Sequence, residues 1–91
     1  METVFVKALN ALSQSNRLAL FKAVADAGEE GLTTTKAAEA AGSLLNTAAV
    51  NLKVLEAAGL IVSSKSGRTV THVAQMDVLS GLAEYLQTIG D

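Results

Sequence analysis

The stretch NTAAVNLKVLEAAGLI, residues 46–61, constrains the fold of this chain most, because it joins two kinds of structure without a linker. Its apolar residues recur at the three- and four-residue spacing of a helix with one buried side. Gly is the residue type that most often follows the last turn of a helix, so Gly59 predicts a helix over residues 46–58. The apolar residues directly after Gly59 predict a strand. The buried face of the helix is expected to comprise Ala48, Leu52 and Leu55.

The rest of the chain shows helical periodicity in four further segments. The sequence contains no Pro, so helices are expected to end at Gly and to begin at capping residues. The Ser and Asn residues of SQSN, 13–16, are expected to cap one helix, and one of the threonines at 33–35 is expected to cap another. GEEG, 28–31, is expected to be a loop. The expected order is α-α-(β)-α-α-β-β-α, mostly α with a small β-hairpin, over residues 3–12, 17–28, 32, 33–42, 46–58, 60–73 and 76–91.

The hairpin over residues 60–73 is expected to carry positive charge at its tip. Ser66 and Gly67 suit a two-residue turn, which would place Lys65 directly opposite Arg68 on one side of the ribbon. Like charges that face each other destabilise a hairpin, and a phosphate group beside them would reverse this effect. The pattern therefore favours a hairpin that contacts a polyanion. Tip charges that are simply solvated are the alternative.

The composition predicts that the chain pairs with another copy of itself. Hydrophobic residues make up 49% of the 91 residues, yet there are only two Phe, one Tyr and no Trp. A monomeric core would therefore rest on Leu, Val and Ala, and apolar surface would be left exposed. Association is the usual way to bury such surface, so we expect a homodimer.

The charge and residue counts bound the class of protein. The net charge of −2 does not by itself indicate a nucleic-acid partner, but the local placement of the seven Lys and Arg residues matters more than their sum. The absence of Cys excludes disulfides, thiolate metal sites and Cys nucleophiles. There is no apolar run of membrane-spanning length, and the start METVFVKALN lacks the pattern of a signal peptide. We expect a cytoplasmic protein that does not enter a membrane.

Three strings in order resemble one family of proteins. KALNALSQSNRLALFKAV resembles the opening of ArsR-type winged helix-turn-helix regulators, in which "ALS", a short gap, "RL" and an apolar helix recur. TTTKAAEAAG looks like their first motif helix. LKVLEAAGLIVSSKSGRTVTHV looks like the end of their recognition helix and their wing. The resemblance covers nearly the whole chain, and the ordered set is more specific than any one string.

The resemblance implies a winged helix-turn-helix fold and a dimeric bacterial transcription regulator that acts as a repressor. The length predicts that residues 1–91 form one domain, and the resemblance implies that its outer helices, 3–12 and 76–89, make the dimer interface. A two-fold dimer would bind a near-palindromic operator in double-stranded DNA. The expected interface residues are Val4, Phe5, Ala8, Leu79, Leu82 and Leu86.

This sequence departs from the family pattern at two places. Metal-sensing members use Cys near the recognition helix, or His and Asp on the last helix, whereas the only His here is His72 on the wing. A single His cannot hold a metal ion, so His72 is expected to be a surface or half-buried strand residue, and neither a metal nor a cofactor is expected. The recognition helix begins with Leu44 and Leu45 in place of Ser-rich residues, and Ala49 stands where a phosphate-binding Ser is common.

The helical period assigns residues of the recognition helix to DNA. With Leu52 and Leu55 buried, the side chains expected to face the bases are Asn46, Thr47, Val50 and Asn51. Asn can pair with the adenine edge, and Thr and Val methyl groups can contact the thymine methyl, so a site containing A·T pairs is expected. The expected phosphate contacts are Thr35, Lys36, Ser43, Lys53, Lys65 and Arg68. Arg17 is expected to have a structural role, pairing with a carboxylate or a carbonyl.

Two other classes of function compete with DNA binding. A winged helix that has lost DNA binding would use its outward apolar residues to bind another protein, and Leu44, Leu45, Val50 and Val54 motivate this alternative. An enzyme is the second class. The sequence has no Cys, no Ser-His-Asp arrangement and no Gly-rich phosphate loop that would support an enzyme. We therefore expect a protein that is not an enzyme.

Overall fold

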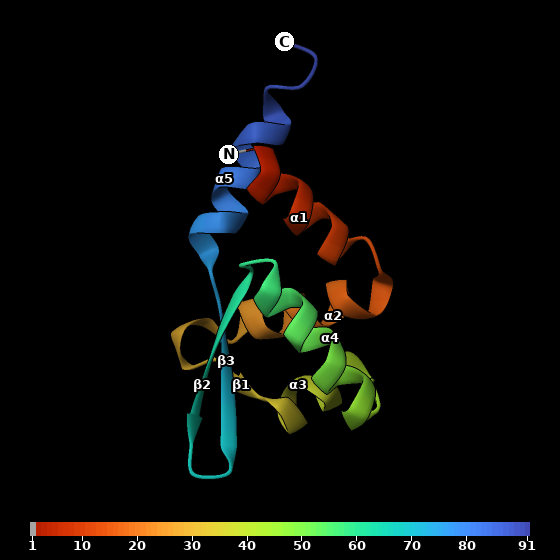
Figure 1. Cartoon of the computed structure of the whole chain (residues 1–91), viewed down its shortest axis with the longest axis vertical. Coiled ribbons are helices and arrows are strands. Elements are labelled where there is room, and N and C mark those ends of the chain that lie inside the picture. Colours follow the sequence, from red (N-terminus) through yellow and green to blue (C-terminus); the bar gives the residue numbers. More distant parts are fainter. Residues whose placement is uncertain (1) are drawn as a thin grey trace.

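The computed structural model describes residues 2–91, and its element order is the predicted one with one short 3-10 helix added (Figure 1). The predicted loop at residues 28–31 is largely this 3-10 helix. No helix in the described range is long and apolar enough to cross a membrane. The elements are α1 (Glu2–Leu12), α2 (Ser15–Asp26), η1 (Gly28–Glu30), β1 (Leu32–Thr33), α3 (Thr34–Ala41), α4 (Leu45–Ala57), β2 (Ile61–Ser66), β3 (Thr69–Ala74) and α5 (Met76–Gln87).

The helix ends follow the capping rules, with one correction. The side chain of Thr33 accepts a hydrogen bond from the backbone N–H of Lys36 at 3.2 Å, as a threonine cap of α3 was predicted to do. The cap of α2 is Gln14, whose Oε1 accepts from the backbone N–H of Arg17 at 2.9 Å. The prediction of a Ser or Asn cap there is therefore wrong. The longer Gln side chain reaches the same free N–H group.

One apolar core joins all five α-helices to the sheet. The buried α2 side chains Leu20, Phe21 and Val24 share this core with Leu52 and Leu55 of α4. The outer helices join the same core through a stacked pair of rings, Phe5 of α1 and Tyr85 of α5, with centroids 5.0 Å apart. The buried apolar residues are Phe5, Ala8, Ala11, Leu20, Phe21, Val24, Ala37, Ala38, Ala48, Leu52, Leu55, Leu60, Ile61 and Leu82.

The three strands form an antiparallel sheet in the order β1-β3-β2. Its register corrects the predicted hairpin, because Ser66 pairs with Thr69 and Lys65 pairs with Val70. The two turn residues are therefore Gly67 and Arg68. Gly67 has a φ of 61°, the conformation that a type II′ turn needs at its first central residue. Lys65 does not face Arg68, so the predicted opposition of like charges does not exist.

The molecule is elongated, with extents of 46 × 22 × 20 Å, and its two ends differ in construction. Figure 1 shows α1 and α5 side by side at one end, where both termini lie. The hairpin tip, α3 and the start of α4 lie at the opposite end. A partner that covers the outer helices would therefore leave the hairpin tip and α3 free.

Candidate nucleic-acid interface

Helices α3 and α4 form a helix-turn-helix pair whose turn is set by Gly42. Gly42 has a φ of 65°, and the backbone N–H of Ser43 donates to the carbonyl oxygen of Ala38 at 2.9 Å. The backbone N–H of Gly42 also donates to the carbonyl oxygens of Ala38 and Glu39, so the bonds of Gly42 and Ser43 together close the last turn of α3. The turn directs α4 away from α3 and leaves the first residues of α4 exposed.

The buried face of α4 contains the three predicted residues and one more. Ala48, Leu52 and Leu55 are buried as predicted, and Asn51 is buried with them at 7% exposure. Asn51 lies three residues after Ala48 and four before Leu55, so its position on the buried stripe could have been inferred from the helical period. The predicted base-contacting residues Asn46, Thr47 and Val50 are exposed. Asn51 is buried and does not face the bases, contrary to the prediction.

Asn51 is held inside by Arg17 of α2. The Oδ1 atom of Asn51 accepts from Nη1 of Arg17 at 3.5 Å. The same guanidinium donates from Nε to the carbonyl oxygen of Ala11 at 2.6 Å and from Nη2 to that of Asn10 at 3.4 Å. Arg17 thus caps the end of α1 and connects it to α4. The prediction that Arg17 has a structural role and pairs with a carbonyl is confirmed.

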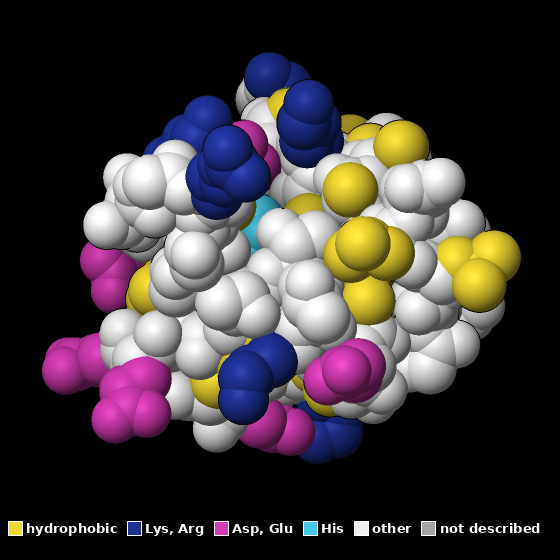
Figure 2. All heavy atoms as spheres, turned by 90° about the horizontal axis from the view of Figure 1, so that it is seen from below, with side chains coloured by type: hydrophobic (Ala, Val, Ile, Leu, Met, Phe, Trp, Pro, Cys, Tyr) yellow, Lys and Arg dark blue, Asp and Glu magenta, His cyan; other side chains and the backbone are white. Residues whose placement is uncertain are grey.

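The exposed side of α4 and of the turn before it is unusually apolar. Leu44 is 79% exposed, Val50 is 64% exposed and Leu45 is 51% exposed. Figure 2 shows apolar side chains gathered on one half of this end of the molecule, beside a group of Lys and Arg side chains. Leu44 is the N-cap of α4 and makes no side-chain capping bond, so the first backbone N–H groups of the helix have no side-chain acceptor there.

The structure brings several of the predicted phosphate-binding residues together. Arg68 at the wing tip and Thr35 of α3 line one hollow, together with Thr33, Thr34 and Thr69. Lys65 is exposed beside this hollow, since its pairing partner Val70 also lines it. The exposed Lys36 lies next to Thr35 on α3. Lys53 of α4 is also exposed, and it borders a second hollow between α4 and the wing. The half-buried Ser43 lies apart in the turn, where its hydroxyl donates to the carbonyl oxygen of Leu44 at 3.1 Å.

His72 ties the wing to the helix-turn-helix pair. The structure places it inside the protein at 5% exposure, so the prediction of a surface or half-buried residue is wrong. Its Nδ1 lies 2.7 Å from the hydroxyl of Ser63 on β2, and its Nε2 lies 2.8 Å from the hydroxyl of Thr34 on α3. Burial lowers the pKa of His72 below 6.5, and the Glu56 carboxylate partly opposes this shift. Within residues 2–91 no cluster of three His, Cys, Asp or Glu side chains could hold a metal ion.

The lowered pKa of His72 predicts that acid weakens the fold. An unfolded chain takes up a proton on His72 as the pH falls through about 6.5, whereas the folded chain resists it. Stability should therefore fall below pH 6.5 until the lower folded pKa is reached, with a slope of at most about 1.4 kcal/mol per pH unit. Urea unfolding between pH 7.5 and 5.5 measures this slope. The His72→Gln variant should lose it, and an equal slope in that variant would contradict the assignment.

The outer helices keep apolar surface after the core is formed. Of the predicted interface residues, Phe5, Ala8 and Leu82 are buried in the chain itself, and Leu79 packs partly against its core. Val4 and Leu86 are 44% and 43% exposed. Three further apolar side chains on these helices, Val6, Leu9 and Met76, are also exposed. The prediction of the interface did not include these three exposed residues, and the dimer contact itself stays a prediction.

Comparison with known proteins finds one matching family and several solved structures of the same fold. Residues 12–64 match the protein family described as helix-turn-helix domain. An ArsR-like transcriptional regulator from Rhodococcus sp. RHA1 superposes with a TM-score of 0.79 at 25% sequence identity, covering 98% of this chain and 81% of that one. No curated protein matches the chain.

Two further solved structures share the fold at lower identity. One is the homodimeric winged helix-turn-helix DNA-binding domain of a possible ArsR-family transcriptional regulator from Mycobacterium bovis, with a TM-score of 0.74, 24% identity, and coverage of 93% of this chain and 77% of that one. The other is NolR from Sinorhizobium fredii, with a TM-score of 0.73, 17% identity, and coverage of 98% and 87%. The predicted winged helix-turn-helix fold is confirmed.

Proposed function

We propose that this chain is a dimeric transcription regulator that reads duplex DNA and acts as a repressor. The chain belongs to the helix-turn-helix domain family and has the ArsR-type winged helix-turn-helix fold. The observation that carries the proposal is one surface at the end opposite the outer helices. There the exposed start of α4, the threonines of α3 and the cationic wing tip lie together. An α-helix fits the major groove, and a basic hairpin suits the phosphate backbone beside it.

The contacts we propose divide into two kinds. Asn46, Thr47 and Val50 of α4 face the bases. The residues proposed to contact phosphate groups around them are Thr35, Lys36, Ser43, Lys53, Lys65 and Arg68. Four of these six are cations, which gives eight cations in a dimer. Neutralised phosphates release counterions, so affinity should fall steeply with salt.

The dimer we propose forms through α1 and α5. These helices carry exposed apolar side chains at the end away from the wing, and the composition leaves apolar surface for a partner to cover. A two-fold axis at this end would present two α4 helices to successive major grooves, about one turn of duplex apart. Residues 1–91 act as one unit in this proposal.

Selection from a random pool of duplexes tests the proposal. The purified protein is incubated with the pool at about 50 mM salt, and the bound duplexes are sequenced after several rounds. An enriched near-palindrome with half-sites about 10 base pairs apart is the expected result. Failure to retain any duplex, even at this salt concentration, would contradict DNA binding.

A protein-docking module is the second candidate, because Leu44, Leu45 and Val50 expose apolar side chains where DNA-binding helices more often carry polar ones. The two candidates differ in their response to a polyanion. A regulator of the proposed kind is retained on bulk duplex DNA at low salt, whereas a docking module is not. Only the first candidate accounts for the cations at the wing tip.

The exposed aliphatic side chains predict that the operator is read through thymine methyl groups. Val50 can contact such a methyl, and burial of one methyl-sized group contributes about 0.8 kcal/mol. Replacing one contacted thymine by uracil in each half-site removes two such contacts and should weaken binding about tenfold. Titration of the selected duplex, with uracil placed at each thymine in turn, measures this. Uracil outside the contacted steps is the control, and equal binding with uracil throughout would contradict methyl readout.

A further inference from the structure

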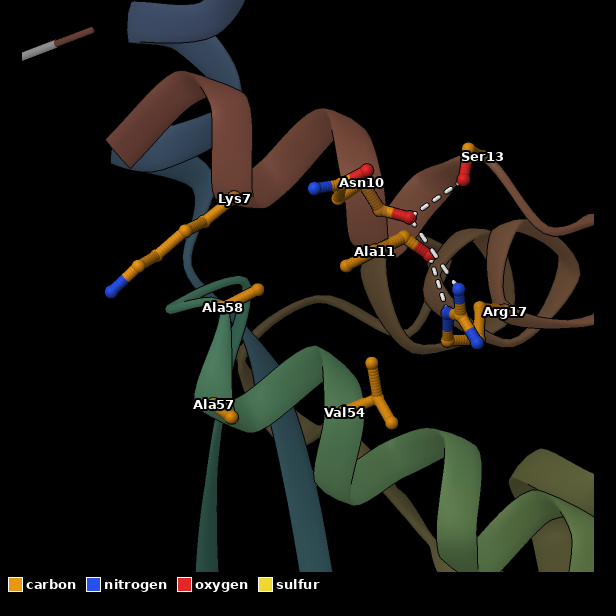
Figure 3. A pocket seen from close by; sticks show the side chains of 8 residues that line it. All are labelled: Lys7, Asn10, Ala11, Ser13, Arg17, Val54, Ala57 and Ala58. Carbon is orange, nitrogen blue, oxygen red and sulfur yellow. Dashed lines mark hydrogen bonds between the residues drawn. The ribbon is translucent and has the colours of Figure 1, made fainter. Parts of the chain in front are cut away.

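A groove runs between the end of α1 and the last turns of α4 (Figure 3), and none of the residues proposed to contact DNA lines it. Its volume of about 540 Å³ lies in the range of sites that bind small molecules. Val54 and Ala57 of α4, with the C-cap residue Ala58, form an apolar wall. Arg17 and Lys7 lie toward opposite ends of the groove in Figure 3. The lining residues are Lys7, Asn10, Ala11, Ser13, Arg17, Val54, Ala57 and Ala58.

The groove carries two basic side chains, and within residues 2–91 neither forms an ion pair with a carboxylate. The one ion pair among residues 2–91 joins Lys22 to Asp26, so neither Arg17 nor Lys7 has a carboxylate partner in that range. Arg17 uses three N–H groups on neutral oxygen acceptors. A guanidinium has five, so two N–H groups remain for a ligand. A half-buried guanidinium beside an apolar wall attracts an anion more strongly than a fully solvated one does.

We propose that this groove binds a small organic carboxylate with a compact apolar body. The carboxylate pairs with the guanidinium of Arg17, the apolar body covers Val54 and Ala57, and the ammonium group of Lys7 adds attraction from the other end. No acidic residue lines the groove, which favours an anion over a cation. The shallow and open form of the groove favours a ligand the size of a single ring or a short acyl chain.

The position of Arg17 gives the ligand a route to α4. Arg17 holds the last carbonyl groups of α1 and the buried Asn51 of α4 at the same time. A carboxylate that draws the guanidinium into the groove competes with the 3.5 Å bond to Asn51. Asn51 adjoins Val50, which the proposed function assigns to base contact. This step rests on the proposed function, and we infer that the ligand weakens DNA binding.

Amide chemical-shift titration of the isotope-labelled full chain tests the site without DNA. The probes are benzoate and hexanoate, and their neutral amides, benzamide and hexanamide, serve as matched controls. Saturating shifts at Val54, Ala57 and Ala58 are expected with at least one carboxylate at millimolar concentration. The matched amide should bind at least tenfold more weakly. No saturating shift at these residues with either carboxylate, or equal binding of acid and amide, would overturn the proposal.

Two variants locate the site without removing Arg17, which the fold needs. Ala57→Glu puts a negative charge on the exposed wall of the groove and should weaken carboxylate binding at least tenfold. Ala40→Glu adds the same charge on the exposed side of α3, and binding should be unchanged. Equal affinity in the Ala57→Glu variant would overturn the site.

Duplex titration with and without saturating ligand then measures the coupling. A several-fold loss of DNA affinity is expected, and an unchanged affinity would overturn the link to α4. If the chain binds no DNA at all, the chemical-shift result still stands, so failure of the groove and failure of the proposed function are distinguishable.

Discussion

Replacing Lys65 and Arg68 together with alanine is expected to weaken binding to every duplex by a hundredfold or more at low salt. Both side chains are exposed at the wing tip, and Arg68 shares a hollow with the threonines of α3. Each subunit would lose two phosphate contacts, so a dimer would lose four. The plot of log affinity against log salt should become shallower by about 3 to 4, since each phosphate contact contributes about 0.9 to the slope.

A second double variant, matched in net charge, separates the loss of phosphate contacts at the wing from the general effect of removing two positive charges. Lys7→Ala with Lys22→Ala also changes the net charge of each subunit from −2 to −4. Lys7 lies in the α1–α4 groove, and Lys22 pairs with Asp26 on α2. This control should change the slope by less than 1. Equal losses in the two double variants would show that the wing has no specific contact with phosphate.

Replacing Gly31 with alanine is expected to destabilise the fold by about 3 kcal/mol or more. Gly31 has φ 65° and ψ −165°, a backbone conformation that is nearly exclusive to Gly. An added Cβ would also lie 2.1 Å from the backbone oxygen of His72. That oxygen belongs to β3, so relief of the contact would have to move the strand that carries one side of the wing. Urea denaturation of both proteins measures the difference.

Gly28 provides the matched control. It has the same φ of 65°, but an added Cβ would meet nothing within 4 Å. Gly28→Ala should therefore cost only the backbone strain, about 1 kcal/mol. A loss in Gly31→Ala no larger than that in Gly28→Ala would show that the contact with β3 does not constrain the fold.

The sequence correctly predicted those features of the fold that depend on the residues of a single segment. The buried face of α4 follows from the spacing of Ala48, Leu52 and Leu55, and the Thr cap of α3 follows from local chemistry. The helix boundaries shifted by a few residues, because the last turn of a helix depends on the bonds that its end groups find. For example, α5 ends at Gln87 rather than continuing to residue 89 or 91.

The sequence-based predictions were wrong or incomplete where the structure depends on tertiary contacts or on the geometry of a turn. Gly67 can occupy either central position of a two-residue turn. Moving the turn by one residue shifts the partner of every β2 residue by two, as for Lys65, which pairs with Val70 and not with Arg68. His72 is buried where Thr34, far away in the sequence, and Ser63, opposite it on β2, bond its two ring nitrogens. The α1–α4 groove joins residues 7–17 to residues 54–58, and no pattern within either segment indicates that they meet.

The most direct test of the account is a map of amide chemical shifts on the labelled protein as the selected duplex is added. We expect shifts at Asn46, Thr47 and Val50, at the start of α3, and at the wing tip, with little change in α1 and α5. Shifts concentrated on α1 and α5, or shifts on α4 with none at Lys65 and Arg68, would contradict the proposed DNA-binding surface.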